Sequence, residues 1–364
     1  MNKSANKGEW SELYALFKLL SDGDLHAGDA NLNNIKNLIY PIIRIIRGDA
    51  KGEIDYEYND CKDIVLILND GTELARIPVR KFTENAQILL RSIKEAHTST
   101  FEVPDIIPFR EEVFASKIKA DSLDKSDITI VVHDPRTGIK PKLGFSIKSE
   151  LGMPPTLLNS GKTTNFIYKL TTNISQTDID TINSLDNIFK KLKAIYQNSS
   201  LDFCGIEKSP MSGNMFYNNL VLIDTILPSM IAEMLKYRYL YNINSISEIT
   251  ALLNEHNPFN FDMSNHHSYY ESKIKHLLTD IALGMTPAHV WNGIYDANGG
   301  YLIVKETGDI ICYHIYNKKE FEDYLFVNTK LDTPSATRYK FGMIEEDTQG
   351  NQFIKLNLQI RFIK

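Results

Sequence analysis

The sequence has few cysteines, no long apolar run and no excess of positive charge. Its three cysteines, Cys61, Cys204 and Cys312, are odd in number and far apart, which excludes a disulfide framework and any cysteine-based zinc motif. No run approaches 18 uncharged apolar residues, and the start of the chain lacks the apolar stretch of a secretory signal. We therefore expect a cytoplasmic protein that does not enter a membrane.

The charge and composition are those of an ordinary globular protein. A net charge of −6 argues against a protein that coats nucleic acid, because phosphate neutralisation by Lys and Arg drives such binding. It does not exclude a local basic cleft. The chain has 364 residues and is 43% hydrophobic, which suffices for two domains or one large elaborated domain.

The pattern of apolar residues predicts a mixture of helices and strands. Residues 8–23 form an amphipathic pattern with Leu13, Leu16, Phe17 and Leu20 on one stripe, and Glu12 lies at the border of that stripe. Further helices are predicted over about 32–47, over 83–96 and across much of 175–283. Strand pairs are predicted over 63–79, over 127–149 and in the last eighty residues.

One strand of the central pair carries an unusual row of polar residues. On the strand at 143–149, Ser146, Lys148 and Glu150 point to one side, while Phe145 and Ile147 point to the other. Asp127 opens the neighbouring strand. Phosphodiester hydrolysis needs carboxylates to hold Mg²⁺ and a cation near the attacking water. An aspartate at one strand and a lysine on the next supply both, although a salt-bridged hairpin explains the same residues.

The metal site needs a second carboxylate. Ser146, two residues before Lys148, is a poor metal ligand. Two sources offer the missing acid: Glu150 on the same strand face, or Glu12 with Glu9 from the first helix. We favour Glu12, because a carboxylate at the edge of a buried stripe has to tolerate partial desolvation and a shared metal stabilises it. A Glu12–Lys148 ion pair without metal is the simpler alternative.

Two other motifs are weaker candidates. Gly161-Lys162-Thr163 is the tail of a phosphate-binding loop, but position 156 is Thr where the motif requires Gly. We therefore expect no nucleotide cofactor, and a loop that contacts phosphates of a larger ligand is the better interpretation. His266, His267 and His276 lack the i, i+4 spacing with an intervening glutamate that a helical zinc site shows.

Several blocks resemble the HpaII-type restriction endonucleases, a family of the PD-(D/E)XK nuclease superfamily. The blocks are NKGEWSELYALFKLL, KSDITIV, FSIKSELG, PTLLNSGKTTNFIY, GMTPAHVWNG and KLNLQIRFIK, and they extend over nearly the whole chain. The resemblance implies a type II restriction endonuclease that cuts double-stranded DNA at a short palindrome, CCGG in the namesake, with Mg²⁺. It implies that Asp127 binds the metal, that Lys148 is catalytic, and that Ser146 occupies a slot usually held by an acid. An eroded nuclease that binds DNA without cutting it is the alternative.

The resemblance also sets the expected architecture. We expect an α/β fold with a mixed central sheet flanked by helices and with helical and β-rich additions for DNA recognition. The expected regions are a nuclease core at 1–174, a helical region at 175–299 and a β-rich region at 300–364. A homodimer suits a palindrome, since two-fold symmetry places one site on each strand. The expected DNA contacts are Ser160, Lys162, Thr163, Asn165, Arg338 and Lys340.

Overall fold

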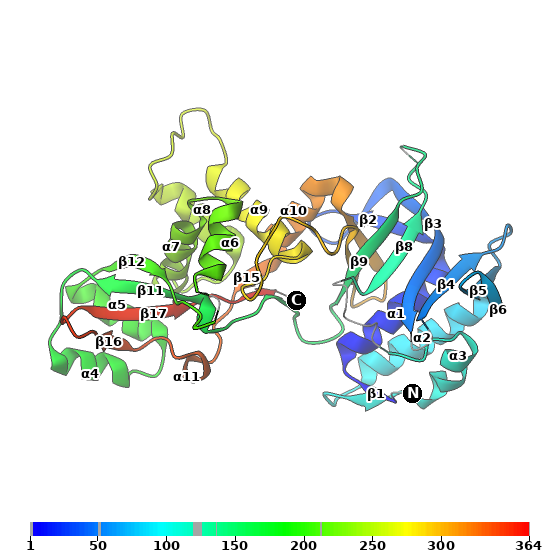
Figure 1. Ribbon diagram of the computed structural model, residues 1–364, viewed down its shortest axis with the longest axis horizontal. Helices are drawn as coiled ribbons and strands as arrows, with labels where there is room; N and C mark the ends of the chain where they lie inside the picture. Colours follow the sequence, from blue (N-terminus) through cyan, green and yellow to red (C-terminus); the bar gives the residue numbers. More distant parts are fainter. Residues whose placement is uncertain (1–2, 50–51, 119–125, 136, 212, 364) are drawn as a thin grey trace. The chain divides into compact units, whose positions relative to one another are not determined.

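The computed structural model describes residues 3–49, 52–118, 126–135, 137–211 and 213–363 (Figure 1). The chain forms two compact units. Unit 1 comprises residues 1–155 and 295–324, together with the last residue; unit 2 comprises 156–294 and 325–363. No helix among the described segments is both long and apolar enough to cross a membrane.

Unit 1 is built on a nine-stranded mixed sheet with the order β2-β14-β13-β9-β8-β3-β4-β5-β6. Most neighbours are antiparallel, but β13 runs parallel to β9 and β14 parallel to β2. The predicted mixed α/β fold is therefore confirmed. The strands of this sheet are β2 (Asp24–Gly28), β3 (Asn34–Asp49), β4 (Gly52–Tyr58), β5 (Ile64–Asn69), β6 (Thr72–Pro78), β8 (Ile128–Val132), β9 (Lys142–Ser149), β13 (Gly300–Val304) and β14 (Ile310–His314).

The first helix of unit 1, α1 (Lys7–Asp22), confirms the predicted amphipathic helix and packs against this sheet. Asn6 and Glu9 form a capping box at its start, and Gly23 ends it with a φ of 75°. The left-handed conformation costs little free energy here, because glycine has no Cβ atom. The buried stripe of α1 includes Trp10, Leu13, Leu16, Phe17 and Leu20.

An aromatic cluster joins α1 to two further helices, α2 (Val79–Glu95) and α3 (Ile107–Glu112). Phe17 of α1, Phe82 of α2 and Phe109 of α3 make edge-on contacts with ring centroids 5.1–6.1 Å apart. Aromatic pairs in this arrangement add about 0.5–1.5 kcal/mol each beyond their buried area. The cluster therefore holds together the helical layer that packs on the large sheet. The remaining elements of unit 1 are β1 (Ser4–Ala5), β7 (Phe101–Glu102), η1 (Pro104–Ile106) and η3 (Ile315–Asn317).

The predicted helix at 32–47 is wrong, because this segment is the sixteen-residue strand β3. Its first half pairs with β2, and its second half pairs with β4 and β8. The run of β-branched isoleucines, Ile42, Ile43, Ile45 and Ile46, favours a strand, and pairing on both sides outweighs the apparent helical spacing.

Unit 2 combines two small sheets with a set of helices. One sheet has the order β12-β11-β17-β16 and the other β10-β18-β15. The strands are β10 (Thr156–Leu158), β11 (Asn165–Leu170), β12 (Leu201–Ile206), β15 (Thr329–Leu331), β16 (Ile344–Glu346), β17 (Gln352–Asn357) and β18 (Ile360–Phe362). The helices are η2 (Lys162–Thr164), α4 (Gln176–Ser184), α5 (Ile188–Asn198), α6 (Met215–Ile223), α7 (Leu227–Leu240), α8 (Ile246–His256), α9 (Tyr269–Leu283) and α11 (Ala336–Tyr339).

The two units do not coincide with the three consecutive regions expected from the sequence. Strands β13 and β14 belong to the sheet of unit 1, although they follow the helical region in the chain. Residues 156–174 belong to unit 2 rather than to the nuclease core. The chain returns to unit 2 within α10 (Lys318–Asn328). The expected bounds are therefore corrected, because parallel pairing of β13 with β9 brings distant residues into one sheet.

Candidate active site and DNA-contact surface

The predicted strand pair around Asp127 and Lys148 is confirmed as β8 and β9, which pair antiparallel in the centre of the large sheet. Asp127 immediately precedes β8, and its backbone N–H donates to the carbonyl of Phe145 at 2.8 Å. Ser146 and Lys148 lie on β9, on the same strand face. The pairing therefore brings the aspartate and the lysine to one place.

A short chain of hydrogen bonds connects these three side chains. The Oδ2 atom of Asp127 accepts the backbone N–H of Ile147 at 2.7 Å and the hydroxyl of Ser146 at 3.2 Å. The ammonium of Lys148 donates to the Ser146 hydroxyl at 3.1 Å. Ser146 is buried, whereas Asp127 and Lys148 are partly exposed. Ser146 therefore bridges the carboxylate and the ammonium, in the slot where an acid was expected.

Tyr301 lies beside this chain and was not singled out by the sequence analysis. It is directly opposite Ser146 in the parallel pairing of β13 with β9. The Lys148 ammonium lies over its ring, 5.2 Å from the centroid. Burial raises the pKa of the Tyr301 hydroxyl well above its usual value, and the negative charge of Asp127 adds to this shift. No local pattern reveals this neighbour, since about 150 residues separate the two strands.

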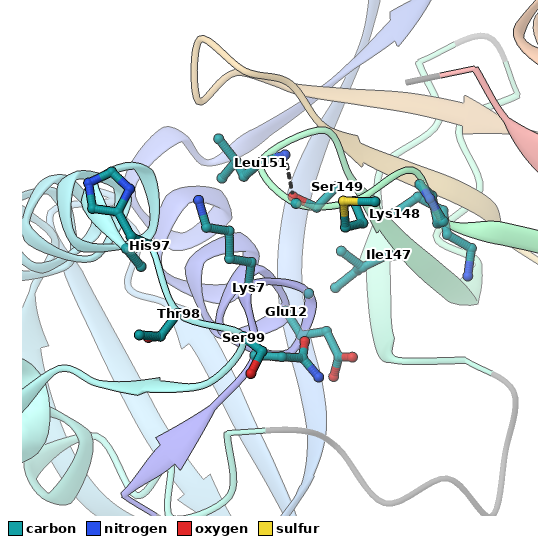
Figure 2. Close-up of a pocket in the computed structure, with 15 residues that line it drawn as sticks. Lys7, Glu12, His97, Thr98, Ser99, Ile147, Lys148, Ser149 and Leu151 are labelled. Carbon is teal, nitrogen blue, oxygen red and sulfur yellow. Dashed lines mark hydrogen bonds between the residues drawn. The ribbon is translucent and has the colours of Figure 1, made fainter.

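Glu12 and Lys148 both line a pocket of about 780 Å³ in unit 1 (Figure 2). Glu12 projects from α1, and the pocket wall also includes Lys7, His97 and Ile147. Ile147 belongs to the face of β9 that packs in the core against α1, which is the side from which Glu12 reaches the pocket. The Lys148 side chain reaches the pocket from the other face of β9, because neighbouring residues of a strand point to opposite sides. Asp127 is not among the residues that line it.

The other two candidate carboxylates make structural hydrogen bonds. Glu9 accepts the backbone N–H of Asn6 at 3.0 Å in the capping box of α1. Glu150 follows β9 and accepts the backbone N–H of Glu306 at 3.1 Å. Each carboxylate therefore stabilises a turn of the backbone.

The donor set suits a hard divalent cation. Within the described ranges, no three His, Cys, Asp or Glu side chains gather as a preformed metal site. Mg²⁺ commonly binds through one or two carboxylates while water and substrate phosphate oxygens fill its remaining positions. Asp127 with one further carboxylate therefore fits this mode of binding, in which the substrate completes the coordination.

The predicted DNA contacts all lie in unit 2, in two loops that include the short helices η2 and α11 and that buried asparagines hold together. Asn357 donates to the carbonyl of Gly161 at 2.7 Å and to the side-chain oxygen of Asn165 at 2.6 Å. Asn165 in turn donates to the carbonyl of Tyr339 at 2.9 Å. The loop that contains Ser160, Lys162 and Thr163 is thereby fixed beside the turn that contains Arg338 and Lys340.

The prediction that Asn165 contacts DNA is wrong. It is 0% exposed, and its amide also donates to Glu207 at 2.6 Å. Its side chain is therefore inaccessible to a DNA ligand. Lys162, Arg338 and Lys340 are exposed, while Ser160 and Thr163 are partly exposed, so these five remain candidate contacts. The loop leads through η2 into strand β11 and not into a helix, unlike a phosphate-binding loop.

Similarity to known proteins identifies the family of this chain. The model of the HpaII restriction endonuclease family matches residues 6–362. The chain belongs to the HpaII restriction endonuclease family. It is also 48% identical over 363 residues to the type II restriction enzyme HpaII of Haemophilus parainfluenzae, covering 99% of each chain. No solved structure matches it significantly.

Membership in the HpaII family makes the chain a type II restriction endonuclease, which cleaves double-stranded DNA in a sequence-specific manner. The resemblance stated from the sequence is thus confirmed. Type II restriction endonucleases generally use divalent metal ions, and the oxygen donors at β8 and β9 are compatible with this requirement.

Proposed function

We propose that this enzyme hydrolyses phosphodiester bonds at CCGG with Mg²⁺ as its cofactor, using Asp127 and Lys148 as the catalytic pair. The observation that carries the proposal is the hydrogen-bond chain from Lys148 through Ser146 to Asp127 across two paired strands. The CCGG site rests on the name of the 48% identical relative.

In the proposed site, Asp127 would hold the cation together with Glu12, the carboxylate of helix α1 that lines the same pocket as Lys148. A bound Mg²⁺ supplies Lewis acidity and stabilises the charge that develops on the phosphate oxygens. Glu9 and Glu150 serve the backbone and are the weaker ligand candidates.

Lys148 orients the attacking water and compensates negative charge in the transition state. Its ammonium is held 3.1 Å from the Ser146 hydroxyl, which in turn donates to Asp127. Ser146 therefore takes the positioning task of the usual acid without adding a second negative charge next to Asp127. A lysine fixed in this way loses less side-chain entropy when substrate binds.

DNA recognition is assigned to the two loops of unit 2. Positive charge on Lys162, Arg338 and Lys340 suits phosphates or guanine edges, and the hydroxyls of Ser160 and Thr163 suit phosphate oxygens. A homodimer on a palindrome places one Asp127–Lys148 pair at each strand.

The test compares Asp127→Asn and Lys148→Ala with the wild type on a CCGG-containing duplex in Mg²⁺. Asp127→Asn keeps the shape and an acceptor for Ile147, but removes the charge that the metal needs. Lys142→Ala is a matched control, since Lys142 is an exposed lysine at the opposite end of β9.

We expect both site variants to lose cleavage by at least about 10³-fold while they retain duplex binding, because several kcal/mol of charge stabilisation disappear. The Lys142→Ala enzyme cuts normally. Retained cleavage in either site variant contradicts the assignment. A wild-type protein that binds this duplex but never cuts it supports the eroded-nuclease alternative.

A further inference from the structure

The aromatic ring of Tyr301 is placed to hold the catalytic lysine. Tyr301 is only 3% exposed and lies on β13, the strand that pairs with β9 in parallel. Its direct partner in the pairing is Ser146, and Lys148 is opposite Ile303 two positions further. Directly opposed residues share a face of the sheet, so Ser146, Lys148 and Tyr301 project to the same side.

We propose that Tyr301 is a positioning residue that holds the Lys148 ammonium over its ring and against Ser146 for the cleavage step. The inference rests on the proposed function of Lys148 and deepens it. The Nζ atom lies 5.2 Å from the ring centroid and 3.1 Å from the Ser146 hydroxyl. An ammonium within about 6 Å of a ring centroid is attracted by the negative charge of the aromatic face.

Lysine needs such support because its four-carbon stem is flexible. An unrestrained lysine populates many rotamers, so holding its ammonium in one position costs entropy that favourable contacts must offset. The Ser146 hydroxyl restrains the ammonium from one direction and the Tyr301 ring from another. The ring adds no negative charge, so the charge of Lys148 remains available for the phosphate.

Tyr301 is itself held rigidly. It makes an edge-on contact with Phe321, with ring centroids 5.4 Å apart, and its backbone is in the centre of the sheet between β9 and β14. A side chain in a packed core has one position, so it is a fixed platform for a mobile amine. These features separate Tyr301 from a tyrosine that merely fills space near the site.

The test uses three replacements at position 301 and one matched control. Tyr301→Phe retains the ring, Tyr301→Leu removes it, and a fluorinated phenylalanine at position 301 retains the shape but withdraws electrons from the aromatic face. Tyr313→Leu removes a buried tyrosine from the same layer, at the position on β14 that pairs with Tyr301. Single-turnover cleavage, duplex affinity and the thermal midpoint are measured for each.

We expect Tyr301→Phe to cut within about 2-fold of the wild type, and Tyr301→Leu to cut about 3- to 30-fold more slowly with unchanged duplex affinity. The fluorinated variant falls between them although it folds as stably as Tyr301→Phe. Tyr313→Leu lowers the thermal midpoint but not the cleavage rate. The fluorinated variant keeps the test valid even when Tyr301→Leu does not fold.

A second measurement is independent of cleavage. Acetic anhydride labels exposed amines, so the rate at which Lys148 is acetylated, read by mass spectrometry, reports how well its ammonium is held. We expect labelling of Lys148 to rise by about 3-fold or more in Tyr301→Leu and to stay unchanged in Tyr301→Phe.

The inference is overturned if Tyr301→Leu cleaves as fast as the wild type. It is also overturned if Tyr313→Leu loses as much cleavage rate as Tyr301→Leu. A fluorinated variant that cuts as fast as Tyr301→Phe also overturns it. These outcomes leave the proposed function intact. Failure of the proposed function shows itself differently, as normal cleavage by Lys148→Ala.

Discussion

Replacing Ser146 by alanine tests the bridge between the two side chains proposed as the catalytic pair, Asp127 and Lys148. The change removes one hydroxyl and with it two hydrogen bonds, from Ser146 to Asp127 at 3.2 Å and from Lys148 to Ser146 at 3.1 Å. It leaves the Ile147 N–H bond to Asp127, because that donor is backbone. Asp127 therefore keeps its backbone donor, whereas Lys148 loses the hydroxyl that restrains its ammonium.

The size of the effect follows from the charges involved. A hydrogen bond to a charged group contributes about 1.5–3 kcal/mol, and the two bonds share one hydroxyl, so their contributions are not additive. If the loss acts on the transition state, the cleavage rate falls by about 10- to 150-fold. Duplex affinity stays the same, because Ser146 is buried and has no access to the DNA.

The assay is single-turnover cleavage of a labelled duplex by Ser146→Ala, with duplex affinity measured in parallel. Ser149→Ala is the matched control. Ser149 lies on the same strand, but on the opposite face, where its hydroxyl is 2.8 Å from that of Ser11 of α1 and accepts the backbone N–H of Leu151 at 3.1 Å. We expect Ser149→Ala to lose about 1 kcal/mol of stability and no cleavage rate. A Ser146→Ala enzyme within 2-fold of the wild-type rate refutes the bridge.

Further predictions concern the metal site and the DNA-contact loops. Removal of divalent metal with EDTA abolishes cleavage and Mg²⁺ restores it, as measured on the same duplex, since Asp127 needs a cation to act on phosphate. Glu9→Gln retains near-normal cleavage rates because its carboxylate caps α1; a complete loss of cleavage in a folded variant makes Glu9 a metal ligand instead. Asn165→Leu destabilises the protein by about 2–4 kcal/mol in chemical unfolding, since it leaves buried partners unsatisfied, and unchanged stability contradicts the role of this amide. Arg338→Ala lowers the slope of log affinity against log salt by about one if it contacts phosphate, and relaxes base preference if it reads guanine; an unchanged slope and preference exclude this arginine from the interface.

Local patterns predicted the pairing of β8 with β9 because the information for it is local. Asp127 and Lys148 belong to two strands joined by one turn, so alternation of side chains and hairpin pairing suffice to bring them together. The first helix was also predictable from local sequence, since its apolar stripe and its capping residues are close together in the chain. The proximity of Asp127 and Lys148 therefore followed from spacing, whereas their proposed roles came from the family resemblance.

The remaining features depend on contacts between distant segments. Tyr301 reaches Lys148 only because β13 pairs with β9, and nothing in either segment specifies the other as its partner. Strand β3 was predicted to be a helix because its partners are three other strands, β2, β4 and β8, which its own sequence does not specify. Asn165 seemed an exposed loop residue, but Asn357 and the Tyr339 carbonyl enclose it from the far end of the sequence.

The position of β13 in the chain also sets the order in which the enzyme becomes complete during synthesis. Strand β9 ends at Ser149, and its neighbour β13 begins at Gly300, after nearly all the helices of unit 2. At roughly 5–20 residues per second, a ribosome takes about 8–30 s to make the intervening chain. During this interval one edge of β9 has no strand beside it, and the Lys148 side chain has no Tyr301 ring. A nascent or truncated polypeptide therefore carries Asp127 and Lys148 in an unfinished sheet. The host that makes this DNA-cutting enzyme is exposed to its active form only after the chain is almost fully translated.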